Sequence, residues 1–112
     1  MNGDVSEDKL VSKVIRLADL VSFQDGAIVS YTLVDKDTGT ITLFAFDKDQ
    51  GLSEHKAPFD ALIYLLDGEA LVTISGRLFK LKEGQMIIVA ANNSHSVKAI
   101  EKFKMLLVMI RS

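Results

Sequence analysis

Two histidines, His55 and His95, are the side chains of this sequence best suited to chemistry near neutral pH. An imidazole can exchange a proton at a pH of about 6.5, donate or accept a hydrogen bond, or bind a metal ion. The alternative for each is a hydrogen-bonded residue of the core, the commoner role of a lone histidine in an apolar strand. Ser53 lies near His55 in the sequence, but the nucleophile elbow, orienting acid and oxyanion hole of acyl transfer are missing around it.

The composition narrows the class of protein. The chain has 112 residues, of which 48% are hydrophobic and 25% charged, as expected for one globular domain spanning residues 1–112. A net charge of −2 provides no basic patch for phosphates, so nucleic acid is not an expected partner. The absence of cysteine excludes disulfides and thiolate sites. We find neither a signal peptide nor an apolar run of about 18 residues, so we expect a cytoplasmic protein without membrane contact.

The N-terminal part of the chain leaves two structures open. Residues 1–9 are polar, and we expect them to be flexible. Within residues 10–21, apolar side chains recur at spacings of three and four, which predicts a helix that Ser6 would cap. The β-branched Val14 and Ile15 equally favour a short strand followed by one helical turn. The sequence therefore predicts a short helix or strand before the main domain.

From Ala27 onward the pattern changes to that of an all-β domain. Apolar and β-branched runs alternate with clusters of Gly, Asp and Asn that are typical of turns. Eight or nine strands at spacings of roughly 8 to 12 residues are typical of a sandwich or a closed barrel. The predicted strands cover residues 27–34, 40–46, 61–66, 69–75, 78–81, 85–89, 95–99 and 103–110.

The first histidine lies in a stretch, residues 51–68, that resembles the first sequence motif of the cupins. Cupins are small jelly-roll barrels, also called double-stranded β-helices. Counting back from Gly68 places His55 at the first histidine position of that motif. Ala57 stands at the second histidine position and Ala61 at the glutamate position.

The second histidine resembles part of the second cupin motif. Gly84 and His95 match the glycine and histidine positions. Ala90, Asn92 and Ala99 stand where that motif has proline, glycine and asparagine. The turns and apolar positions are thus kept better than the residues that carry cupin chemistry.

The resemblance covers about residues 40–110 and implies a single-domain barrel of the cupin-2 type. Side chains alternate between the two faces of a strand, so an inward His55 predicts inward side chains along the strand that follows it. In the same way His95, on the facing wall, brings its own strand neighbours inward. The predicted ligand-binding residues are His55, Ala57, Ala61, Ile63, His95, Val97 and Ala99.

A metal site is the cofactor that the resemblance implies, with Zn, Fe, Mn or Ni as the divalent ion. Only His55 and His95 remain of the four cupin ligand positions. Catalytic zinc sites usually take three protein ligands, and non-haem iron takes two histidines and a carboxylate. Asp60 lies one residue from the glutamate position and would reach the site only if a β-bulge turned it inward.

Three functions from different classes follow from this pattern. The first is a small-molecule-binding or sensing barrel, in which one imidazole donates a hydrogen bond to the ligand and the other accepts one. The alternative is a metal-dependent cupin enzyme of the isomerase, decarboxylase or dioxygenase type that uses His55 and His95. The third is a structural module without a ligand.

The last predicted strand, residues 103–110, is apolar on both faces apart from Lys104. A strand of this kind is usually covered on both sides. One face can fill the barrel, and the other needs a cover from the N-terminal segment or from a second subunit. We therefore expect a homodimer, which is also common among the proteins that this chain resembles.

Overall fold

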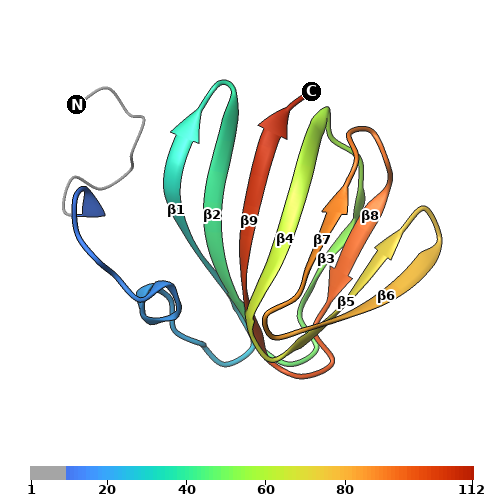
Figure 1. Cartoon of the computed structure of the whole chain (residues 1–112). Coiled ribbons are helices and arrows are strands. Elements are labelled where there is room, and N and C mark those ends of the chain that lie inside the picture. The colour runs from blue at the N-terminus through green and yellow to red at the C-terminus, as the bar shows by residue number, and fades with distance from the viewer. Residues whose placement is uncertain (1–9) are drawn as a thin grey trace.

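The computed structural model describes residues 10–112, which form two antiparallel sheets that enclose one interior (Figure 1). The predicted all-β jelly-roll barrel is confirmed. Its nine strands are β1 (Ile28–Lys36), β2 (Gly39–Phe46), β3 (Gly51–His55), β4 (Phe59–Asp67), β5 (Glu69–Ile74), β6 (Arg77–Lys82), β7 (Met86–Val89), β8 (His95–Lys98) and β9 (Phe103–Arg111).

Sheet A has five strands in the order β1-β2-β9-β4-β7, and sheet B has four in the order β3-β8-β5-β6. After β2 the chain passes repeatedly from one sheet to the other, which is the connectivity of a jelly roll. In Figure 1, β1 lies at one side of the molecule and β6 at the other. Within residues 10–112, no helix is long and apolar enough to cross a membrane.

Eight strands lie within two residues of their predicted ends, and β3 is the strand that the pattern did not predict. Glycine is common in turns, so the sequence pattern does not predict a strand that begins at Gly51. Gly51 pairs instead with Lys98 inside a ladder. A Cβ atom added at Gly51 would lie 2.6 Å from the carbonyl oxygen of Val97, so glycine here permits a close approach of two strands.

The interior is filled from the end of the barrel opposite the histidines. Phe46 and Phe103 are fully buried cross-strand neighbours whose rings stack with centroids 4.6 Å apart. Apolar side chains from both sheets continue this core. Its buried members are Phe46, Ala61, Ile63, Leu65, Ala70, Val72, Leu81, Val89, Val97, Ala99, Phe103 and Met105.

The N-terminal segment covers part of the outer face of sheet A. The chain is extended at Arg16 and then forms one 3-10 turn, η2 (Leu17–Leu20). Val21 is buried behind this turn in a second cluster with Leu43 and Ala45 of β2. The expected flexibility of residues 1–9 and the cap at Ser6 lie outside the described residues.

Candidate functional site

His55 and His95 form a cross-strand pair at one end of sheet B. They lie opposite each other on β3 and β8, and their ring centroids are 4.4 Å apart with the planes tilted by 53°. The expectation that they face each other from opposite walls is therefore wrong. Both rings belong to one wall, because β3 and β8 are neighbours in the same sheet.

A β-bulge in β3 places His55 opposite His95. Leu52 pairs with Val97 and His55 pairs with His95, so β3 advances three residues while β8 advances two. Without the extra residue, Glu54 would stand opposite His95. The bulge therefore decides that an imidazole, and not a carboxylate, meets His95.

Backbone carbonyls hold both imidazoles in the same tautomer. Nδ1 of His55 lies 3.0 Å from the carbonyl oxygen of Ser53, and Nδ1 of His95 lies 3.3 Å from that of Asn93. Because a carbonyl oxygen can only accept, each Nδ1 carries the proton and each Nε2 of a neutral ring is an acceptor. The pair thus offers two acceptor nitrogens, whereas the sequence led us to expect one donor and one acceptor.

The two rings differ in exposure. His95 is the only buried polar side chain within the described residues, with 8% of its surface exposed, while His55 is exposed. Burial lowers the pKa of His95 below its ordinary value, and the nearby His55 lowers it further. The hydrogen bond to Asn93 opposes this shift of the pKa only in part. His95 is therefore neutral at pH 7.

The residues that follow His55 do not continue its strand, although the prediction assumed that they do. Strand β3 ends at His55, and β4 begins at Phe59 in the other sheet. Ala57 lies in the crossover between them, where its carbonyl oxygen accepts a hydrogen bond from the Asn92 amide at 2.8 Å. Pro58, which lacks an N–H and so cannot donate to a ladder, is also part of this crossover.

The other predicted ligand-binding residues belong to the core. Ala61 and Ile63 face the interior from sheet A, and Val97 faces it from sheet B, each with 3% or less of its surface exposed. Ala99 is fully buried just after β8. The structure thus brings these residues to the same interior as His95, and their contact with a ligand stays a prediction.

The loop before β8 contains one residue in the left-handed conformation. Asn92 stands at a glycine position of the second cupin motif and has φ 67°, in the left-handed region. Asparagine is among the residues other than glycine that adopt this conformation most readily. This explains how the turn that leads to His95 forms without the motif's glycine.

The donor set does not fit the metal sites of a cupin. The Asp60 carboxylate accepts a hydrogen bond from the Ala91 amide at 2.9 Å, and no bulge in β4 at this position turns it inward. The Glu54 carboxylate accepts one from the Ser94 hydroxyl at 2.5 Å. Within residues 10–112, no group of three His, Cys, Asp or Glu side chains is arranged to hold a metal ion. Two imidazoles alone do not supply the three protein ligands of a catalytic zinc site.

Sequence reasoning missed a row of inward side chains that extends the histidine pair across sheet B. His95 is also opposite Ile74 of β5, and Ile74 is opposite Arg77 of β6. A guanidinium therefore stands in the same cross-strand row as both imidazoles. Side chains two residues apart on a strand point to the same face, so the spacing of Leu81, Phe79 and Arg77 on β6 could have indicated that Arg77 lies on the inner face.

The fold and the site define a small jelly-roll barrel with an imidazole pair near one end of its interior. The family model described as "Cupin domain" matches residues 42–111, which is more than half of the chain. The chain belongs to the cupin family.

Solved structures agree with this assignment. A conserved protein of unknown function from Streptococcus pyogenes is 36% identical, with a TM-score of 0.87 over 90% of this chain and 89% of that one. A cupin superfamily protein from Desulfitobacterium hafniense is 27% identical, with a TM-score of 0.86 over 90% and 93%. A cupin 2 conserved barrel domain protein from Leptotrichia buccalis is 41% identical, with a TM-score of 0.84 over 87% of this chain and 47% of that one. No curated protein matches the chain.

Proposed function

We propose that this cupin binds a small molecule, as a carrier or sensor, through the Nε2 atoms of His55 and His95. The observation that supports this is the pair of rings 4.4 Å apart, each with Nδ1 bonded to a backbone carbonyl. Two fixed acceptors beside an apolar interior suit a ligand with an apolar body and a hydrogen-bond donor. Ala57 and Ala61 stand at the second histidine position and the glutamate position of the first cupin motif, so two of the four metal-ligand positions carry no polar side chain.

Binding of such a ligand should depend on pH. Protonation at Nε2 turns an acceptor into a donor and places a positive charge beside the second ring. The ligand's donor then has no acceptor at His95, so affinity falls as the pH drops below 6.5 toward the lowered pKa of His95. The lowered pKa of His95 keeps its acceptor available to a lower pH than an ordinary histidine would.

A thermal-shift screen of small polar compounds tests the proposal. Compounds that raise the melting temperature at about pH 8 should lose about tenfold in affinity in His55→Phe and in His95→Phe, the size expected for one lost hydrogen bond. Lys56→Gln is the matched control, because Lys56 is exposed and follows His55 outside β3. A screen without stabilising compounds, or compounds that bind both variants as well as wild type, would refute the proposal.

A metal-dependent enzyme of the isomerase, decarboxylase or dioxygenase type is the second candidate. The observation in its favour is the hydrogen bond from each Nδ1 to a carbonyl, which is also how metal-ligating histidines are commonly held. Elemental analysis of tag-free protein, grown with added Zn, Fe, Mn and Ni, tests it. About one metal per chain, absent from His95→Phe, would support the enzyme. No metal after supplementation would count against it.

A further inference from the structure

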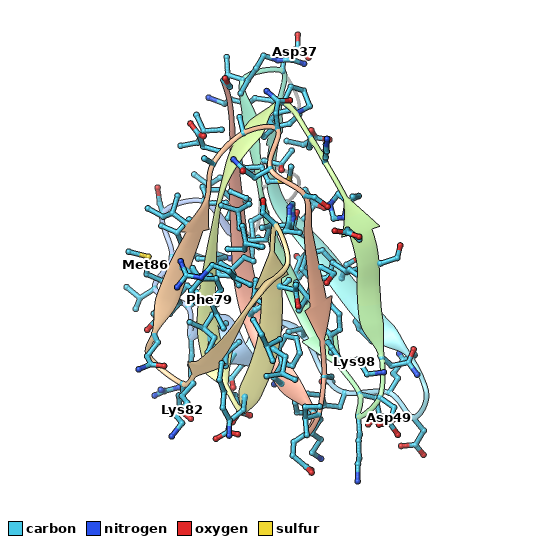
Figure 2. All side chains as sticks on the ribbon, turned by 90° about the vertical axis from the view of Figure 1, so that its right-hand side faces the viewer. Asp37, Asp49, Phe79, Lys82, Met86 and Lys98 are labelled. Carbon is cyan, nitrogen blue, oxygen red and sulfur yellow. The ribbon has the colours of Figure 1, made fainter. Side chains whose placement is uncertain are left out.

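A cleft opens between the edges of the two sheets, where β6 of sheet B and β7 of sheet A leave the barrel wall incomplete. It has a volume of about 480 Å³. Phe79 on β6 and Met86 on β7 are labelled on this side of the molecule in Figure 2. The residues that line the cleft are Ile74, Ser75, Arg77, Phe79, Ile87, Ile88, Ala90 and Asn93.

The cleft continues the inner surface that carries the histidines. Ile74 lines it and is the cross-strand neighbour of both His95 and Arg77. Ile74 and Ile87, which both line the cleft, are partly buried and pack against the main core. The row Arg77-Ile74-His95 therefore joins a cation to an imidazole across an apolar side chain.

The charge of Arg77 is available to a ligand. Its guanidinium lies 5.0 Å from the centre of the Phe79 ring, and within residues 10–112 it has no ion pair. None of the described lining residues is acidic. An arginine held by an aromatic face keeps its planar fork of N–H groups free, and that fork fits a carboxylate.

We propose that this cleft binds the anionic end of an elongated organic acid, with the carboxylate on Arg77 and the apolar body over Ile74, Phe79 and Ile87. The inference rests on the proposed function, because it assigns the far end of the ligand to His95, the cross-strand neighbour of Ile74. Arg77 and His95 lie on strands two places apart in sheet B, so about 10 Å separates their strands. An aliphatic acid of about eight carbons with a terminal hydroxyl spans that length.

Three probes separate the two ends of the site. Omega-hydroxyoctanoate carries both groups, octanoate only the carboxylate, and octanol only the hydroxyl. We expect the affinity, measured by titration of amide NMR signals, to decrease from omega-hydroxyoctanoate to octanoate to octanol. The signals of Ile74, Phe79 and Ile87 should move with both acids.

Two matched variants test the role of Arg77. Arg77→Gln should lower the affinity for octanoate by about tenfold, as expected when a charge-assisted hydrogen bond is lost. Lys82→Gln makes the same change of charge on β6 at an exposed residue of the opposite face and should leave the affinity unchanged. Equal binding of octanoate to wild type and Arg77→Gln, or of octanol and octanoate to wild type, would overturn the inference.

The results that would refute the proposed function differ from those that would refute the carboxylate site. If omega-hydroxyoctanoate binds no more tightly than octanoate and is unaffected by His95→Phe, the histidine end has no role, while the loss in Arg77→Gln still supports the carboxylate site. If neither acid moves any signal of the cleft, the carboxylate site is refuted as well.

Discussion

At the scale of single residues, the site depends on His95, a buried imidazole between Ile74 and His55 in its sheet. Burial disfavours the charged form of a ring because it removes water from around the charge. A second ring close by adds repulsion once both are protonated. The neutral form of His95 is therefore favoured. This is the form that a donor ligand or a metal ion requires.

The first prediction concerns the titration of His95. NMR should give His95 a pKa below the ordinary 6.5, because burial disfavours its charge. In His55→Gln the pKa of His95 should rise but stay below 6.5, because removing the neighbouring charge leaves the burial in place. A pKa of His95 at or above 6.5 in the wild type would contradict this.

The same shift of the pKa has a consequence for folding. The unfolded chain binds a proton at His95 more readily than the folded chain, so protons favour unfolding. The contribution of His95 to stability is complete above pH 6.5 and is lost as the pH falls from 6.5 toward its lower folded pKa. Urea titrations should show this loss in the wild type and a smaller one in His95→Gln.

The second prediction tests the space around Ala61. It is 2% exposed and belongs to the main core, so Ala61→Leu should overpack the interior and destabilise the fold by about 1 to 3 kcal/mol. Ala90→Leu makes the same change at an exposed position and should alter stability by less than about 0.5 kcal/mol. An unaltered stability of Ala61→Leu in urea would mean that free space for a ligand exists beside this residue.

At the scale of elements, two short segments are held in place by single side-chain hydrogen bonds, one on each sheet. The bulge in β3 brings His55 to the inner face, and the Ser94 hydroxyl bound to Glu54 joins that bulge to the loop before β8. The N-terminal segment is held in a comparable way. The ammonium of Lys104 donates to the carbonyl of Ala18 at 2.6 Å and lies 5.3 Å from the centre of the Phe23 ring.

The third prediction follows from this contact. Lys104→Ala should lower the free energy of unfolding by about 1 to 3 kcal/mol, because it removes a charge-assisted hydrogen bond and a cation–π contact. Amide exchange in residues 17–23 should become faster. Lys82→Ala is the control, since Lys82 is exposed, and it should change neither quantity. Unchanged exchange in Lys104→Ala would show that apolar packing alone holds the segment.

At the scale of the whole molecule, the outer face of sheet A is apolar beyond the N-terminal segment. Ile41, Val108, Leu62 and Ile88 are cross-strand neighbours in one row across four strands. Ile88 is 57% exposed, and Met86 and Ile110 are 53% and 59% exposed. We call these six residues, together with Tyr64 beside Met86, the outer strip. Contiguous exposed apolar residues of this kind mark interaction surfaces.

We propose that a second copy of the chain covers the outer strip. The strip has no charged side chain, so two copies meet without repulsion and the same residues serve on both sides of a two-fold interface. This is the homodimer that the apolar C-terminal strand led us to expect.

The fourth prediction tests this dimer. Ile88→Asp should shift the protein from dimer to monomer in analytical ultracentrifugation, because it buries an unpaired charge in the interface. Leu78→Asp is the control, since Leu78 is 64% exposed on sheet B, and it should leave the mass unchanged. A monomeric wild type, or a dimeric Ile88→Asp, would refute the proposal.

The sequence by itself determined the strands and the family. Alternating and β-branched runs between turn residues predicted eight strands to within two residues, because side-chain period and turn chemistry are local properties. The spacing around Gly68 and Gly84 led to the cupin family, and the family model confirms it. His55 and His95 were also identified as a pair from their motif positions.

Only the tertiary structure decided how that pair is built. A bulge shifts the register by one residue, and register depends on pairing between distant strands, which no local pattern contains. For this reason the sequence placed the histidines on facing walls and extended the strand of His55 through Ala57. The row that joins Arg77 to His95 through Ile74 arises in the same way, from three strands that are adjacent only once the sheet has formed.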